Sequence, residues 1–335
     1  MKHPIEVTEL WGDGIGPELR EAVHAVAAAL PIDIEFQPVD LSVQGRERRG
    51  QTAYFEAVQS IQRTKLAVKY PTVHDSDDPN AILRRWLGVS VIHRPVISIE
   101  GISSNFKKDV ALHIVRIATG GAYDDPGKLI GTDAAVSLRI VERRPCRDAA
   151  GFAFELARTK GLSVTSASQH TIQRMTDGLF ESAVNEVARK YADVAHQVVP
   201  FDDLLAKIIL HPQNYQVVLC LNEYGDFLSD LACGLVGSVG TGARGSFSFT
   251  EEGDLATAIF DPAVGTEPEI AGQNRCNPTA ALLAFGLMLD HIGRYDLGHT
   301  LRLALLDTIR EGERTEDLEG SLSATEFTER VIERL

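Results

Sequence analysis

Apolar and polar positions along the chain form blocks that predict strands followed by helices. A run rich in apolar residues at 6–11 predicts a strand, an Ala- and Val-rich segment at 19–30 predicts a helix, and a second apolar run lies at 32–36. Pro17 suits the start of that helix because proline lacks the amide proton that a first turn leaves unpaired. Strand, helix and strand in this order predict a parallel unit of an α/β sheet.

The same alternation continues to the end of the chain. Two segments interrupt it and predict irregular structure: a polar stretch at 72–80 and a glycine-rich stretch at 234–253. Further strands are expected at 65–69, 89–97, 109–117, 136–141, 162–167 and 216–221, and further helices at 81–87, 147–159, 179–191, 277–292, 296–311 and 324–334.

Composition and charge narrow the class of protein. The 335 residues are 44% hydrophobic and 24% charged, which is typical of a soluble globular protein of about two domains. A net charge of −14 opposes binding to nucleic acid and to anionic membranes, so neither partner is expected. The four cysteines show no zinc-type spacing, and the chain begins without a basic-then-apolar signal segment. Reduced thiols and a cytoplasmic location are therefore expected.

Three aspartates are the strongest candidates for chemistry. Asp226 and Asp230 are four residues apart in a predicted helix, so their carboxylates share one helix face, and Asp202 lies upstream. Two such carboxylates repel each other unless a cation lies between them, and oxygen ligands suit Mg²⁺ or Mn²⁺. Taken alone, this spacing more often marks two solvated helix carboxylates.

A glycine-rich turn follows the first predicted strand. Gly12, Gly14 and Gly16 resemble a dinucleotide-binding fingerprint, but the position that requires a further glycine is Pro17. A Rossmann site is therefore weakly supported. The turn either brings the backbone close to a ligand or simply connects a strand to a helix.

Three arginines lie near predicted element ends in the first third of the chain: Arg84, Arg94 and Arg116. Guanidinium groups bind carboxylates through paired hydrogen bonds, so three that converge would hold a di- or tricarboxylate. Each one alone is as well explained by a solvated surface position. Tyr123 follows a glycine turn and would act as a general acid only beside a cation or a hydrogen-bond network.

Together these motifs resemble the decarboxylating β-hydroxyacid dehydrogenases, namely isocitrate, homoisocitrate and 3-isopropylmalate dehydrogenases. The similarity covers nearly the whole chain. The segments that carry it are 12–18, 80–95, 115–123, 176–180, 225–230, 265–278 and 315–320.

The resemblance implies a fold and a domain arrangement. It predicts an α/β chain with a two-domain isopropylmalate-dehydrogenase-like fold and a mixed sheet, not a Rossmann fold. Residues 1–95 with 244–335 would form a large, cofactor-side domain, and residues 96–243 a small domain that carries the metal site and the dimer interface. The substrate would bind in the cleft between them.

The resemblance also implies roles for the candidate residues. The metal, Mg²⁺ or Mn²⁺, would be held by Asp226 and Asp230 together with Asp202 of the partner subunit, so a homodimer is expected. Tyr123 would help to protonate the product after hydride transfer and loss of carbon dioxide. The carboxylates of a malate-type substrate would be bound by Asn80, Arg84, Arg94 and Arg116.

The cofactor implied by the resemblance is NAD. It would lie along residues 265–277, where Gly265, Thr266 and Asn277 match the family pattern. Glu269 occupies an acidic position of the NAD-dependent members. Because a carboxylate accepts hydrogen bonds from ribose hydroxyls and repels a 2′-phosphate, NAD is favoured over NADP.

Several positions depart from the family pattern. Gln169 occupies the place of the helper lysine and has no titratable proton, which leaves its catalytic role in this chain open. The adjacent His170 would face the opposite side of an extended segment. Asp78 stands where a serine reads the variable arm of isocitrate, and its charge would repel a third carboxylate.

Because some positions match the family pattern and others depart from it, two functions are considered. The first is a metal-dependent NAD oxidoreductase that oxidises, and decarboxylates, a malate-type 2-hydroxy acid whose side arm differs from that of isocitrate. The second is a catalytically impaired homologue that binds ligand or serves as a regulatory partner of an active chain. A third possibility, an α/β binding protein without a metal, would require the Asp and Arg matches to be accidental.

Overall fold

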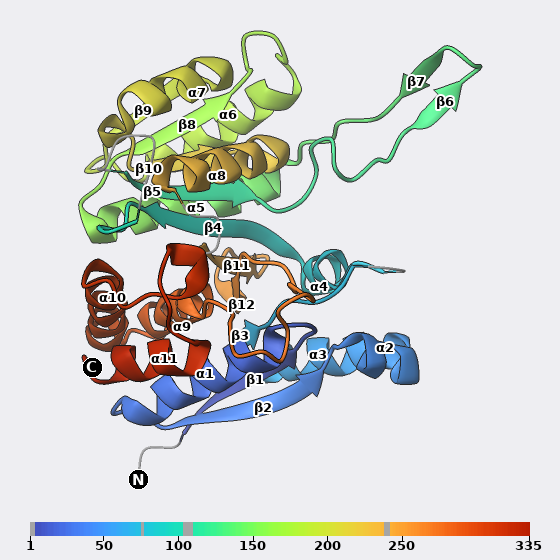
Figure 1. Ribbon diagram of the computed structural model, residues 1–335. Coiled ribbons are helices and arrows are strands. Elements are labelled where there is room, and N and C mark those ends of the chain that lie inside the picture. Colours follow the sequence, from blue (N-terminus) through green and yellow to red (C-terminus); the bar gives the residue numbers. More distant parts are fainter. Residues whose placement is uncertain (1–3, 75–76, 103–109, 238–241) are drawn as a thin grey trace.

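One mixed β-sheet forms the centre of this computed structural model (Figure 1). Parts of the predicted segments 72–80, 109–117 and 234–253 lie outside the described residues, as do parts of both predicted domains. The described residues are 4–74, 77–102, 110–237 and 242–335. Within them the sheet runs, edge to edge, through β2 (Ile34–Asp40), β1 (Ile5–Trp11), β3 (Leu66–Lys69), β12 (Leu255–Pro262), β11 (Ala243–Phe249), β4 (Val89–Ile97), β5 (Ala111–Ile117), β10 (Val217–Cys220), β8 (Val164–Ser168) and β9 (His196–Pro200).

Strand direction reverses in the middle of this sheet. β11 is antiparallel to both of its neighbours, β12 and β4, and β4 is antiparallel to β5. The remaining neighbours in the sheet are parallel pairs. A doubly wound dinucleotide-binding sheet is mostly parallel throughout. The chain therefore has the mixed α/β sheet that was expected, and not a Rossmann topology.

Helices cover both faces of the sheet. In Figure 1, α1–α3 and α9–α11 lie with the lower half of the molecule, α5–α8 with the upper half, and β4 runs between them. The helices are α1 (Gly16–Ala29), α2 (Val43–Arg49), α3 (Gln51–Thr64), α4 (Pro79–Leu87), α5 (Arg143–Lys160), α6 (Thr176–Ala188), α7 (Phe201–Leu210), α8 (Asn222–Val236), α9 (Thr279–His291), α10 (Tyr295–Arg310) and α11 (Ala324–Ile332), with short 3₁₀ turns at Pro212–Asn214 and Glu316–Leu318.

The hydrophobic core is continuous across the sheet on one face. A single buried cluster contains Val7 and Phe285 from one half and Phe154 and Val184 from the other. The opposite face carries two separate clusters, one under α3 and α4 and one under α7 and α8. The division into domains of residues 1–95 with 244–335 and 96–243 stays a prediction, because sheet and core cross this boundary.

A two-stranded arm projects from the upper half of the molecule (Figure 1). It consists of β6 (Lys128–Ile130) paired with β7 (Ala134–Val136). The predicted strand at 136–141 is wrong: the strand lies earlier, and beyond it only Ile140 forms an isolated bridge, with Gly121. The returning chain has no neighbouring strand to pair with, so its apolar residues do not extend the ladder.

The glycine-rich segment was also predicted wrongly. Residues 243–249 are not irregular but form β11, which lies between β12 and β4 near the middle of the sheet. A Cβ atom at Gly245 would lie 2.8 Å from the ring of Phe247 and 3.2 Å from that of Phe260, so the glycine there makes room for two aromatic side chains. This glycine therefore reflects close packing within a strand rather than a loop.

All four cysteines are buried and free. Among the described ranges, no helix has the length and apolar composition needed to cross a bilayer.

Candidate active site

Arg116 and Asp226 form the centre of the candidate site. Arg116 lies on β5 and is only 6% exposed. Its Nη1 donates to Asp226 Oδ1 on α8, and its Nε donates to Asn222 Oδ1 at 2.9 Å. Tyr123 donates its hydroxyl to the other Asp226 oxygen at 3.1 Å. A Cβ at Gly225 would lie 2.7 Å from the Arg116 side chain, so this glycine allows the close approach of helix and strand.

The pKa values of these groups follow from burial and pairing. Burial lowers the pKa of Arg116, and the Asp226 carboxylate counteracts that effect. Burial also raises the pKa of Tyr123, and the negative charge of Asp226 raises it further. The Arg116 guanidinium lies 5.7 Å from the centroid of the Tyr123 ring and opposes this rise. The tyrosine is therefore a hydroxyl donor, with the cation and hydrogen-bond network that a general acid requires.

Arg94 reaches the next turn of the same helix. Its Nη1 donates to Ser229 Oγ and to Asp230 Oδ1, the latter at 3.2 Å. Asp230 itself is largely exposed. Two of the predicted substrate arginines thus lie beside both aspartates predicted from the spacing on α8.

Arg84 lines a small cavity. Lys69, Asn80, Arg244 and Asp261 line the same cavity. Burial, with the positive charges of Arg244 and Arg116, lowers the pKa of Arg84 to about 10. Burial likewise lowers the pKa of Lys69 to about 8. Three cations therefore face one buried carboxylate, that of Asp261, which suits the binding of a further anionic group.

Lys69 and Arg244 were missed by the sequence analysis. Lys69 donates to Tyr70 O at 3.0 Å and to Thr72 Oγ1 at 3.1 Å. Arg244 is opposite Asp261 in the β11–β12 ladder and makes two hydrogen bonds to its carboxylate. Neither residue belongs to a recognisable motif in the sequence. Because irregular structure was expected at 234–253, the strand pairing that places Arg244 opposite Asp261 could not be predicted.

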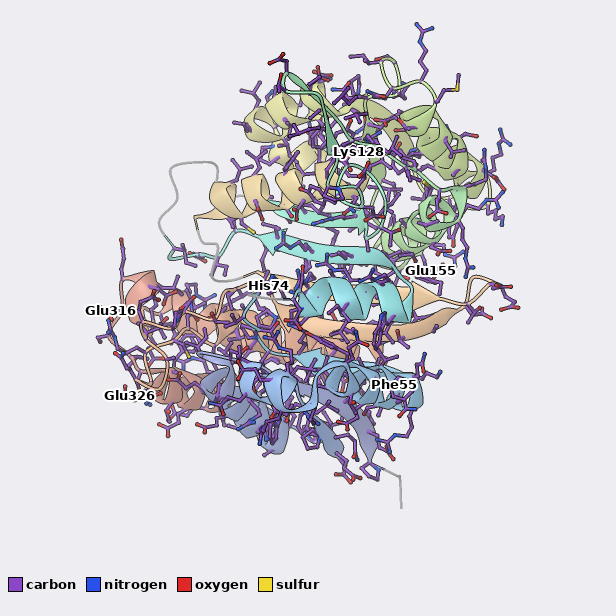
Figure 2. The ribbon with its side chains drawn as sticks, turned by 90° about the vertical axis from the view of Figure 1, so that its right-hand side faces the viewer. Phe55, His74, Lys128, Glu155, Glu316 and Glu326 are labelled. Carbon is purple, nitrogen blue, oxygen red and sulfur yellow. The ribbon has the colours of Figure 1, made fainter. Side chains whose placement is uncertain are left out.

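The two remaining substrate candidates lie at the start of α4. The Asp78 carboxylate caps this helix, because it accepts hydrogen bonds from the amides of Asn80 at 2.9 Å and Ala81 at 3.1 Å. The Asn80 side chain contacts His74 Nε2 at 3.1 Å. In Figure 2, which views the molecule with the arm and its Lys128 toward the reader, His74 lies between the two halves.

Asp202 lies away from the other two aspartates. It is exposed in the first turn of α7. In one chain, the described residues include no group of three Asp, Glu, His or Cys side chains arranged to hold a metal. The oxygen donors of Asp226 and Asp230 suit Mg²⁺ or Mn²⁺, and arginines now neutralise them as a cation would. That Asp202 of the partner subunit completes the set stays a prediction.

Gln169 lies directly after β8. Its backbone amide donates to Asp177 Oδ2 at 2.7 Å. Asp177 also accepts a hydrogen bond from Arg139, whose Nε donates to Glu223 at 2.6 Å. This arginine was not singled out from the sequence, yet it ties the base of the arm to α6 and α8. The extended segment expected at Gln169 and His170 is not present, because the chain turns at His170.

The predicted cofactor segment follows β12. Thr266 O accepts a hydrogen bond from the Ile15 amide at 2.9 Å, so the glycine-rich turn packs against this loop. A Cβ at Gly14, whose φ is +59°, would overlap the Thr266 carbonyl, which explains this glycine by backbone contact. Gly265 and Glu269 are exposed, and no described group pairs with the Glu269 carboxylate.

Asn277 lies at the end of that segment. Its Nδ2 donates to Asp317 at 2.9 Å, and its Oδ1 accepts from the Thr279 amide at 2.9 Å. The side chain therefore joins the loop to α9 and to the 3₁₀ turn that holds Asp317. Exposed backbone beside an exposed carboxylate fits a nucleotide whose ribose presents hydroxyl groups.

Known proteins share this sequence pattern and this fold. The model of the isocitrate/isopropylmalate dehydrogenase family matches residues 6–332. A mitochondrial NAD isocitrate dehydrogenase subunit 2 from Kluyveromyces lactis is 35% identical, over 98% of this chain and 90% of its own length. A mitochondrial NAD isocitrate dehydrogenase regulatory subunit from Dictyostelium discoideum is 31% identical, over 98% of this chain and 92% of its own.

A solved structure gives the same result. The crystal structure of isocitrate dehydrogenase from Methylococcus capsulatus superimposes with a TM-score of 0.87 at 29% identity, over 98% of both chains. The mixed sheet and the clustered Arg and Asp residues define a class of α/β dehydrogenase-like proteins. The chain belongs to the isocitrate/isopropylmalate dehydrogenase family.

Proposed function

We propose that this protein is a metal-dependent NAD oxidoreductase that oxidises, and decarboxylates, a malate-type 2-hydroxy acid. The observation that carries the proposal is the pairing of Arg94 and Arg116 with Asp230 and Asp226 along one face of α8. When substrate and metal bind, each Arg–Asp pair can separate. The arginines would then bind the carboxylates of the acid, and the aspartates would bind the divalent cation.

The side chains have distinct tasks in this reaction. Arg84, Arg94 and Arg116 orient the substrate carboxylates, and Arg116 is itself fixed by Asn222. A bound Mg²⁺ or Mn²⁺ would polarise the hydroxyl and carboxylate oxygens, and NAD would accept the hydride. Tyr123, held by its hydrogen bond to Asp226, donates a proton from its hydroxyl oxygen to the decarboxylated product.

The cofactor proposal rests on charge. Glu269 presents an exposed carboxylate beside the exposed backbone of Gly265, and Thr266 and Asn277 hold the loop in place. A carboxylate there disfavours the 2′-phosphate of NADP, so NAD is the proposed cofactor. The names of the matched relatives also specify NAD.

A homodimer is the proposed assembly. The arm of β6 and β7 exposes Leu129 at 75% and Ile130 at 60%, and Leu138 behind it is 63% exposed. A two-stranded hairpin is marginally stable alone and gains stability by packing against another surface. We propose that a second copy of the chain covers this arm, and that the same contact brings Asp202 of the partner subunit to the metal site.

A second function is that of a regulatory or ligand-binding subunit with impaired catalysis. Gln169 favours it, because an amide cannot accept or donate a proton as an amine does. The Dictyostelium discoideum relative is named as a regulatory subunit. The cytoplasmic location expected from the sequence stays a prediction, and the matched relatives of both organisms are named as mitochondrial.

The test is an assay of NAD reduction with Mn²⁺ over 2- and 3-substituted malates, including malate, tartrate and isocitrate. We expect NADH formation with at least one acid, and its loss in Asp226→Asn. Asp203→Asn is the matched control, because Asp203 pairs only with Lys207 on α7 among the described contacts. Saturable binding of Mn²⁺ and acid without NADH from any substrate would instead favour the regulatory subunit.

A further inference from the structure

A buried carboxylate near Gln169 plays no part in the reaction described so far. Glu181 lies on α6 and is 6% exposed. Ser168 donates to its Oε1 at 2.5 Å, and Ser166 donates to its Oε2 at 2.7 Å. The two serines are two residues apart on β8, so both face the same side of the strand and reach the same carboxylate.

Each serine oxygen also lies beside an imidazole. His170 Nδ1 is 3.3 Å from Ser168 Oγ, and His196 Nε2 is 3.0 Å from Ser166 Oγ. A hydroxyl has one proton, which an ionised Glu181 accepts, so the serine oxygen must accept from the imidazole. His170 then has its proton on Nδ1, and its Nε2 is free to take another.

The surroundings favour a proton at this carboxylate. Besides the serines and His170, Glu181 faces Asp177 on its own helix, Cys146 on α5 and Cys220 on β10. None of these groups has a fixed positive charge. Burial raises the pKa of Glu181, Asp177 raises it further, and the hydrogen bonds of the serines oppose the rise.

We propose that His170, Ser168 and Glu181 form a proton relay that supplies the proton transfer for which Gln169 has no titratable group. The proposal rests on the proposed function, since the proton is that of the hydroxy-acid substrate, and it requires that the substrate hydroxyl bind within reach of His170. The substrate hydroxyl proton passes to His170 Nε2, the Nδ1 proton to Ser168 Oγ, and the serine proton to Glu181. One proton enters and one ends on the carboxylate, while the hydride goes to NAD.

The structure provides a matched pair of variants for testing the relay. Ser168→Ala and Ser166→Ala each remove one hydroxyl from the same carboxylate, but only the first separates Glu181 from His170. The first readout is the ¹⁵N spectrum of the imidazole rings, which reports the nitrogen that carries the proton. We expect Ser168→Ala to lose the Nδ1–H form of His170, and Ser166→Ala to retain it.

The second readout is the pH dependence of kcat. We expect Ser168→Ala to lower kcat by about 10- to 100-fold, with KM within about twofold, because one step of acid–base catalysis is lost. In the parent, kcat for oxidation should increase with rising pH as Glu181 ionises. This increase should be absent in Ser168→Ala and in Glu181→Gln. Gln169→Lys added to Ser168→Ala should restore part of the rate.

The outcomes separate the relay from the proposed function. An active parent whose kcat and pH profile are the same in Ser168→Ala and Ser166→Ala overturns the relay alone. An equal change of the His170 tautomer in both variants also overturns it. A parent without turnover on any acid refutes the proposed function and with it the catalytic use of the relay, whereas the spectrum still decides which hydrogen bonds exist.

Discussion

The ion pairs of the candidate site join residues that are far apart in the sequence. Arg116 and Asp226 are 110 positions apart, and Arg94 and Asp230 are 136 apart. A separate small cavity holds Lys69 and Arg84, whose negative neighbours are Asp261 and Asp78. We therefore expect substrate choice to depend on the local balance of charge and not on the net charge of the chain.

Asp78 is the residue at which this balance is easiest to change. Its negative charge favours the charged forms of Lys69 and Arg84 and offsets part of the positive charge in the cavity. We propose that it thereby disfavours a side arm that bears a third carboxylate. Asp78→Ser retains a helix-capping oxygen, so the fold should be unchanged while isocitrate binds about tenfold more tightly relative to malate. Titration calorimetry of both acids in the presence of Mn²⁺ measures this ratio, and an unchanged ratio contradicts the proposal.

The sequence predicted those site residues that are marked by a local spacing or by a family motif. Asp226 and Asp230 were predicted because a helical spacing is local, and Arg94 and Arg116 because a family motif surrounds them. Lys69, Arg139 and Arg244 could not be predicted, because their importance depends on partners that the strand order brings close.

At the scale of elements, the prediction failed at the glycine-containing β11 and at the arm, and it also missed several segments that have neither feature. The parallel unit around β1 was expected, whereas α3, α7, β9 and β12 were not identified. β11 was missed because its small residues leave space for the rings of Phe247 and Phe260. Local composition does not report such packing, which involves residues on a neighbouring strand.

The antiparallel pair of β4 and β5 contains a buried pair of histidines. His93 Nε2 lies 3.0 Å from His113 Nδ1, so one ring must donate and the other accept. Burial lowers the pKa of His93 well below its usual range and that of His113 to about 4. Both rings are therefore neutral in the folded protein at neutral pH, and protonation of either places a donor against a donor.

This pair predicts the pH dependence of stability. Because the folded pKa of His113 is below the unfolded value, its contribution is present above about pH 6.5 and is lost as pH falls toward about 4. His113→Asn keeps a polar group near Nδ1 but does not titrate. Between pH 7 and 4.5 the variant should lose less free energy of unfolding than the parent, by on the order of 2 kcal/mol. Urea unfolding measures the difference; the exposed His299→Asn is the control, and equal losses in all three proteins contradict the assignment.

At the scale of the whole molecule, one chain presents an incomplete site and an uncovered arm. Asp226 and Asp230 pair with Arg116 and Arg94, and among the described residues Asp202 does not join them to form a metal-binding group. The arm exposes apolar side chains on a hairpin that projects away from the body (Figure 1). A second copy of the chain would account for both features.

The arm predicts the assembly directly. Leu129→Asp combined with Leu138→Asp places two charges on its exposed apolar surface, where burial against a partner would become unfavourable. Sedimentation velocity should show a dimer for the parent and a monomer for this variant. Leu303→Asp, on the exposed face of α10, is the control and should remain dimeric. A parent that sediments as a monomer, or a double variant that stays dimeric, rules out the arm as the interface.

The central claim is that one metal site uses carboxylates from two chains, and subunit mixing tests it most directly. Asp202→Asn and Asp226→Asn homodimers should each lack Mn²⁺-dependent NADH formation. In a mixed dimer, one of the two sites regains both aspartates. After equimolar exchange, about half of the dimers are mixed, so about a quarter of the parent's activity and Mn²⁺ binding should return. No recovery, although native mass spectrometry shows the mixed dimers, would contradict a shared site.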